Sequence, residues 1–69
     1  DLIGWRTVVV TPDMVGQRLA VFTSIEIKTL TGRLRPEQQA WLGVVRGAGG
    51  IAAVARSVAD AVAVLEDAS

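Results

Sequence analysis

Glu26 and Lys28 are the residues of this chain whose types and spacing are best suited to chemistry. They end a mostly apolar stretch over residues 19–28. Side chains of a β-strand alternate between its two faces, so Glu26, Lys28 and Ser24 lie on one face of the expected strand. Burying a carboxylate and an ammonium group costs free energy unless each charge is paired or binds a metal. A metal-binding carboxylate beside a lysine that stabilises charge on a nucleophile or a phosphate is the combination required for phosphodiester cleavage.

A second carboxylate is needed to hold a divalent cation, and Asp1, on an upstream predicted strand, is the candidate. The Glu-x-Lys pattern alone is short, and the plain alternative is an ion pair at the face or edge of a sheet. Three features favour the site: the strand is apolar on both faces, an acidic residue lies upstream, and Gln38 falls on the apolar stripe of the following helix.

The residue inventory excludes several function classes. The 69-residue chain contains no His and no Cys, which argues against a zinc site and excludes a Ser-His-Asp or Cys-His hydrolase. Carboxylates and carbonyls suit hard divalent cations. The absence of cysteine gives no positive sign of an oxidising compartment. Hydrophobic content is 51%, but no apolar run reaches the length of a membrane span, so no membrane partner is expected.

The charge is unevenly distributed although the formal net charge is zero. Residues 1–56 contain seven basic and four acidic residues, a balance of +3, and residues 57–69 contain three acidic residues and no basic one, a balance of −3. Lys28, Arg33 and Arg35 lie close together in the basic part. This distribution permits DNA binding without demonstrating it.

The pattern of apolar and breaker residues predicts one α/β domain over residues 1–69 in the order β-β-β-α-β-α. The predicted elements are short strands over 1–6 and 7–10, a helical turn over 11–16, a strand over 19–28, a helix from Pro36 to the glycines at 47–50, a strand over 51–55 and a helix capped by Ser57. The third strand, the Pro36 helix and the last strand form a βαβ crossover with parallel strands.

Each predicted helix has an apolar stripe at helical spacing. The expected inner stripe of the first helix comprises Gln38, Trp41, Leu42 and Val45. The expected buried face of the last helix comprises Val58, Ala61, Val62 and Leu65. Trp5 is expected in the core or an interface, with stacking on a base as its functional alternative.

The chain resembles the VRR-NUC domains, a branch of the PD-(D/E)XK nuclease superfamily. The matching segments, in order, are 1–4, 25–29 (Ile-Glu-Ile-Lys-Thr), 31–38 (Thr-Gly-Arg-Leu-Arg-Pro-Glu-Gln) and 48–50 (Ala-Gly-Gly). The resemblance implies a restriction-endonuclease-like mixed sheet flanked by helices. It also implies an Mg²⁺- or Mn²⁺-dependent DNA endonuclease with a role in DNA repair, often specific for flapped or branched DNA, with no small-molecule cofactor.

The resemblance also assigns site residues by position. Asp1 matches the first-motif aspartate, Glu26 and Lys28 match the Glu-x-Lys pair, and the carbonyl of Ile27 matches a usual metal ligand. Gln38 matches a glutamine that would orient Lys28 or a water. The Gly-x-Pro that commonly precedes the aspartate is absent because the chain begins at Asp1, and the family's N-terminal helix is missing.

Partners and location follow from the same resemblance. Stand-alone members of this type come from phages and bacteria and look like dimeric Holliday-junction resolvases, which implies a homodimer inside the cell. Arg33 and Arg35 follow the catalytic strand in a loop, where phosphate contacts and simple solvation are equal alternatives. Two other functions stay open: a non-catalytic DNA-binding module of the same fold, and a dimerisation domain in which Glu26 and Lys28 form only an ion pair.

Overall fold

The computed structural model describes residues 2–67, without the side chain of residue 67, so Asp1 and residues 68–69 lie outside the description. Its elements are the 3-10 helix η1 (Pro12–Met14), strand β1 (Thr23–Ile27), helix α1 (Pro36–Gly47), strand β2 (Ile51–Ala55) and helix α2 (Val58–Asp67). Within these residues, no helix has both the length and the apolar character that crossing a membrane requires.

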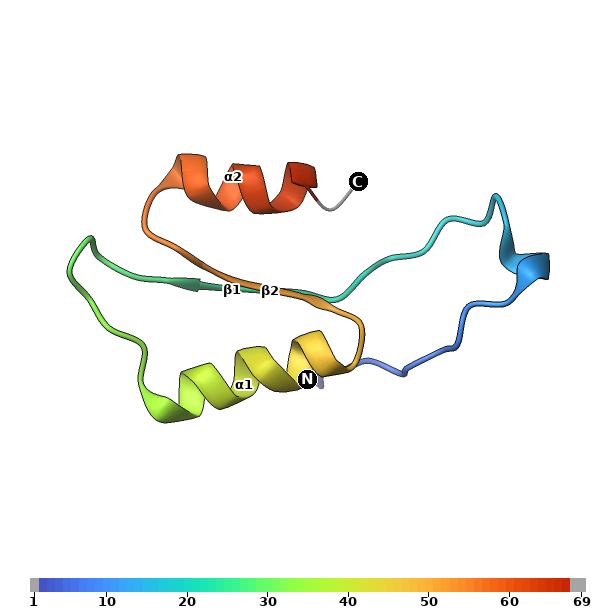
Figure 1. Ribbon diagram of the computed structural model, residues 1–69, viewed down its shortest axis with the longest axis horizontal. Coiled ribbons are helices and arrows are strands. Elements are labelled where there is room, and N and C mark those ends of the chain that lie inside the picture. Colours follow the sequence, from blue (N-terminus) through green and yellow to red (C-terminus); the bar gives the residue numbers. More distant parts are fainter. Residues whose placement is uncertain (1, 68–69) are drawn as a thin grey trace.

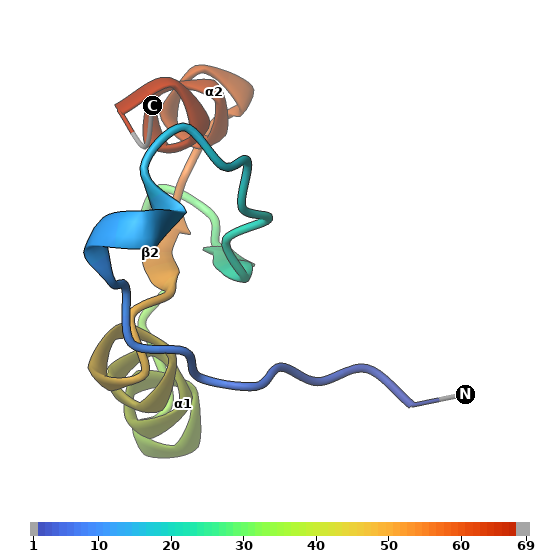
Figure 2. The same cartoon turned by 90° about the vertical axis from the view of Figure 1, so that its right-hand side faces the viewer.

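Strands β1 and β2 form a parallel two-stranded sheet, in register from Thr23 opposite Ile51 to Ile27 opposite Ala55. Helix α1 connects the two strands, which confirms the predicted parallel βαβ unit. Helices α1 and α2 lie on opposite sides of the sheet (Figures 1 and 2). The unit therefore has three layers, with Glu26 and Lys28 in the middle one.

Helix α1 begins and ends where the sequence predicts. Pro36 occupies its first turn, where the missing N–H of proline is not needed. Gly49 follows the helix with φ of +93°, a conformation that favours glycine. Leu42 and Val45 are 1% exposed and form the core with Ala52, against which Phe22, Leu34 and Val54 pack. The Leu42 and Val45 part of the predicted inner stripe is thus confirmed.

Helix α2 begins at the predicted cap but does not bury its apolar face. Ser57 Oγ accepts a hydrogen bond from the Asp60 N–H, and the Asp60 carboxylate accepts one from the Arg56 N–H. Val58, however, is 82% exposed and Leu65 is 55% exposed. The predicted burial of this face is therefore wrong, because these side chains line an open groove with Ile27 instead of packing into a closed core.

The two strands predicted within residues 1–10 are not formed in the described part, residues 2–10. The observed order is η-β-α-β-α, and the sheet is parallel and not mixed. Beta-branched residues favour an extended backbone, but a strand also needs a hydrogen-bonding partner. Residues 4–8, 10 and 19–22 instead line an open groove of about 630 Å³. The strand predicted over 19–28 is shortened to Thr23–Ile27, the residues that pair with Ile51–Ala55 of β2.

Around this groove, the N-terminal limb (residues 2–10) is attached to the βαβ unit through Trp5. The Trp5 ring lies 4.7 Å from Phe22 and 5.6 Å from Trp41, centroid to centroid. Trp41, predicted to be core, is 41% exposed, because the limb covers it only in part. Directly after the limb, the Thr11 hydroxyl donates a hydrogen bond to Asp13, which lowers the pKa of that carboxyl group below its ordinary value.

Candidate functional site

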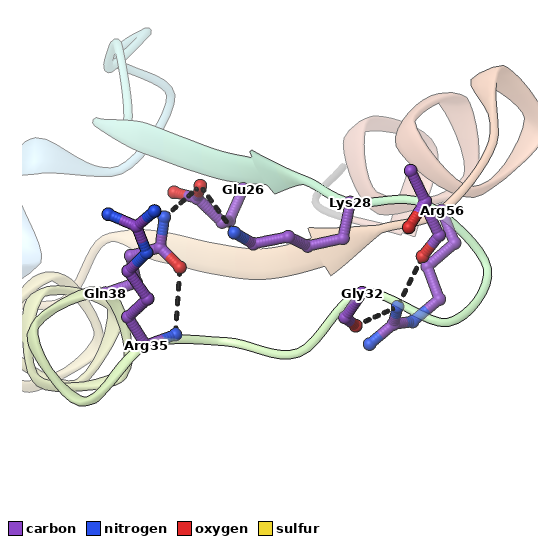
Figure 3. Close-up of polar contacts among 7 residues, drawn as sticks. Glu26, Lys28, Gly32, Arg35, Gln38 and Arg56 are labelled. Atoms are coloured by element: carbon purple, nitrogen blue, oxygen red, sulfur yellow. Dashed lines mark hydrogen bonds and ion pairs between the residues drawn. The ribbon is translucent and has the colours of Figure 1, made fainter.

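Glu26 and Lys28 lie on the face of the sheet that is covered by α1. Glu26 belongs to β1, and Lys28 follows the last residue of that strand. The Lys28 ammonium nitrogen lies 3.9 Å from Glu26 Oε1, and the Lys28 and Glu26 side chains are 18% and 28% exposed. Figure 3 shows the lysine side chain running back along the strand toward the carboxylate. The sequence prediction that these two groups converge on one face is confirmed.

Gln38 links the Glu26 carboxylate to the first turn of α1. Its Nε2 donates a hydrogen bond of 2.8 Å to Glu26 Oε1, and its Oε1 accepts one of 3.0 Å from the Arg35 N–H (Figure 3). The second bond pairs an otherwise unsatisfied N–H at the start of the helix. Gln38 therefore orients Glu26, whereas its predicted action on Lys28 or a water stays a prediction.

Two predicted metal ligands are not tested by the geometry. Asp1 lies outside the described residues. The carbonyl of Ile27 stays a prediction, and the Ile27 side chain is 67% exposed and lines a groove with α2, on the face opposite Glu26. Within residues 2–67, no three carboxylates, histidines or cysteines cluster around one point. Carboxylate and carbonyl oxygens suit Mg²⁺ or Mn²⁺ in kind, but the described residues supply Glu26 as the acidic ligand and need a second acid.

The loop between Lys28 and α1 brings positive charge to the site. Arg33 and Arg35 are both exposed, and Arg35 is the N-cap residue of α1. In Figure 3 the Arg35 guanidinium group lies on the same side as Gln38 and Glu26. The arrangement places a carboxylate, an ammonium group and a guanidinium group around one end of the sheet, which suits the binding of a phosphodiester.

Arg56 is a residue of this region to which sequence reasoning gave no role. Its Nη1 donates hydrogen bonds of 2.6 Å to the carbonyl oxygens of Thr29 and Gly32, in the loop that follows Lys28. A signal was present: Arg56 comes directly after β2, and the carboxyl ends of parallel strands share one sheet edge. Trp41 also contacts this face, since its Nε1 donates a hydrogen bond of 2.9 Å to Ser24.

Comparison with known proteins gives one family. The family model described as VRR-NUC domain matches residues 1–59, which include every predicted site residue. No curated protein and no solved structure gives a significant match to this chain.

Proposed function

Because the chain belongs to the VRR-NUC domain family, a family of nuclease type with DNA as the expected substrate, we propose that it is a metal-dependent DNA endonuclease. The observation that carries this proposal is the convergence of Glu26, Lys28 and Gln38. A three-quarters buried carboxylate is oriented by an amide at 2.8 Å and has an ammonium group at 3.9 Å. Glu26 and Lys28 are each less than one-third exposed beneath α1, where charged groups need partners, and a bound cation would add one.

The chemistry of the donors fits a hard divalent cation. In the proposal, Mg²⁺ or Mn²⁺ is held by Asp1, Glu26 and the carbonyl oxygen of Ile27. When bound, such a cation supplies Lewis-acid polarisation of the scissile phosphate. Glu26 contributes negative charge and a fixed direction, because its Oε1 accepts the hydrogen bond from Gln38.

The remaining side chains have separate roles in this proposal. Lys28 places a positive charge next to the carboxylate, where it stabilises the attacking water or the charge that develops on the phosphate. Gln38 fixes Glu26 against the rigid first turn of α1. Arg33 and Arg35 contact neighbouring phosphates and so position the DNA without reading its sequence.

The preferred DNA structure and the assembly belong to the same proposal. A flapped, branched or Holliday-junction substrate is expected from the family, and a homodimer would place two sites on one junction. The intracellular location inferred from the resemblance stays a prediction.

Cleavage of structured DNA tests the proposal directly. End-labelled flap, fork, four-way-junction and linear duplex DNA are incubated with the protein in Mg²⁺, in Mn²⁺ and in chelator, beside a Glu26→Gln variant. We expect metal-dependent cleavage of a branched substrate and a loss of at least about 100-fold in the variant, since a metal ligand is removed. Equal cleavage by both proteins, or none with either metal, would contradict the proposal.

A non-catalytic DNA-binding module is the second candidate. It is favoured by the contacts that Glu26 already makes with Gln38 and Lys28, which can serve a structural role without a metal. This candidate predicts that the wild-type protein binds branched DNA but never cleaves it, and that Glu26→Gln binds equally well. A domain used only for dimerisation would not bind DNA at all.

A further inference from the structure

Arg56 reaches from the end of β2 across to the loop that follows the catalytic strand. Its Nη1 donates to both the Thr29 and the Gly32 carbonyl oxygens at 2.6 Å (Figure 3). The Gly32 N–H also donates to the Thr29 carbonyl at 3.2 Å, which makes residues 29–32 a tight turn. Arg56 thus closes this turn from outside by binding both of its end carbonyls.

Lys28 stands directly before this turn. Its backbone N–H donates a hydrogen bond of 2.9 Å to the carbonyl oxygen of Ala55, the residue before Arg56. At the end of β2, Ala55 therefore holds the backbone of Lys28, and the next residue, Arg56, holds the turn that follows. A Cβ atom on Gly32 would lie 2.9 Å from Thr29 Oγ1, so this position of the turn leaves little room for a side chain.

From these contacts we infer that Arg56 is a positioning residue of the Glu26–Lys28 site. By fixing the turn, it sets the direction in which the chain leaves Lys28 and carries Arg33 and Arg35 toward the start of α1. It touches the backbone and not the reacting groups, so its effect passes through the turn. The catalytic part of this inference rests on the proposed nuclease function.

Arginine suits this task better than lysine does. A guanidinium group is planar, always charged and presents its N–H donors in a fixed fork, whereas an ammonium group is a flexible point charge. Bonds from a charged donor to carbonyl oxygens are stronger than neutral ones. A shift of about 1 Å in a catalytic group can reduce the rate by about 100-fold, so a well-held turn has catalytic consequences.

The test uses three variants of the whole chain. Arg56→Met removes the donors and keeps an unbranched side chain, and Arg56→Lys keeps charge and donors. Arg46→Met is the matched control, because the Arg46 Nε also donates to a backbone carbonyl, that of Ala52, at 3.0 Å, away from the turn. Both Met variants remove one positive charge, so a general electrostatic effect on DNA is equal in the two.

Amide hydrogen exchange gives a readout that does not depend on activity. In Arg56→Met, we expect the exchange of the Gly32 N–H to accelerate by about tenfold, as one stabilising contact of its turn is lost, while the Lys28 N–H stays protected by Ala55. Arg46→Met should keep slow Gly32 exchange, and the Gly32 exchange rate of Arg56→Lys should lie between those of the wild type and Arg56→Met. Unchanged Gly32 exchange in Arg56→Met would overturn the inference.

Single-turnover cleavage supplies the second readout. When saturated with DNA, Arg56→Met should cleave about 100-fold more slowly than Arg46→Met, and Arg56→Lys should recover only part of the rate. Wild-type cleavage rates in Arg56→Met at saturating DNA would overturn it. An inactive wild-type protein counts against the proposed function, whereas faster Gly32 exchange in Arg56→Met would still support the positioning of the turn.

Discussion

At the scale of single residues, the contact between Lys28 and Glu26 is close enough for attraction but too long for a direct hydrogen bond. The two charged atoms are 3.9 Å apart, and Glu26 Oε1 already accepts a bond of 2.8 Å from Gln38. A purely structural ion pair in a mostly buried position would be expected to have a shorter N–O distance and a direct hydrogen bond between its two charged groups. The loose pair leaves donors of Lys28 available to another negatively charged group, such as a phosphate.

Replacing Lys28 by Ala separates catalysis from metal binding. We expect cleavage to fall by about 100-fold or more, because a charge next to the reacting phosphate is lost. Mn²⁺ binding, measured by calorimetry, should persist, because the oxygen ligands remain. Arg18→Ala is the control, since it removes one positive charge from an exposed position in the N-terminal part of the chain. Full activity of Lys28→Ala would rule out the assigned role.

Replacing Gln38 by Leu tests the orientation of Glu26. The change keeps the size of the side chain but removes the bonds to Glu26 and to the Arg35 N–H. We expect a fall of about tenfold in the cleavage rate and a loss of about 1 kcal/mol in the free energy of unfolding. The adjacent and exposed Gln39 gives the control variant Gln39→Leu. Equal kinetics of the two variants would show that Glu26 needs no support from α1.

At the scale of elements, the βαβ unit acts as the frame that brings Glu26 and Gln38 together. The return from α1 into β2 is the tightest part of this frame. A Cβ atom on Gly50 would lie 2.8 Å from both the Phe22 carbonyl oxygen and Val45 Cγ1. The same glycine N–H donates a hydrogen bond of 2.9 Å to the Val45 carbonyl. Gly50 is thus packed against both Phe22, the residue before β1, and Val45, which belongs to α1 and to the core.

Gly50→Ala should therefore destabilise the unit by about 1–3 kcal/mol, because added volume at a packed site forces neighbouring atoms apart. Gly43→Ala is the matched control: Gly43 lies inside α1, and a Cβ atom there meets nothing within 4 Å. That variant should gain about 1 kcal/mol of helix stability. Urea unfolding followed by circular dichroism measures both. A Gly50→Ala protein as stable as Gly43→Ala would contradict this packing.

The same elements explain which features could be predicted from sequence. Local signals located the βαβ unit: Pro36 and Gly49 mark the ends of α1, and Ser57 with Asp60 marks the start of α2. Strand pairing is non-local, so beta-branched residues at 7–10 could not indicate that a partner strand is missing nearby. The hydrogen bond of Gln38 to Glu26 spans 12 residues, and those of Arg56 span 24 and 27 residues. These contacts are also non-local, so they became visible only in the folded structure.

At the scale of the whole molecule, the chain is more extended than a compact protein of its mass. Its accessible surface is 5781 Å², compared with about 4,200 Å² expected for a compact 7.3 kDa protein. Its radius of gyration is 14.0 Å, compared with about 11 Å expected. The segment that contains η1 extends away from the βαβ unit (Figure 1), and Val58 and Leu65 of α2 are exposed. The excess of about 1,600 Å² exceeds the roughly 800 Å² that each partner buries in a standard interface.

This surface leads to a prediction about self-association. The face of α2 that lines a groove with Ile27 includes Val62, which is 45% exposed, and an apolar face of this kind is stabilised when another surface covers it. We expect sedimentation velocity to show a species of twice the chain mass, and Val62→Asp to shift it to 7.3 kDa. The control is Val44→Asp, which places a carboxylate at a 57% exposed position of α1. A wild-type mass of one chain at every concentration would contradict the homodimer. Two cuts in one DNA junction would then require two successive binding events.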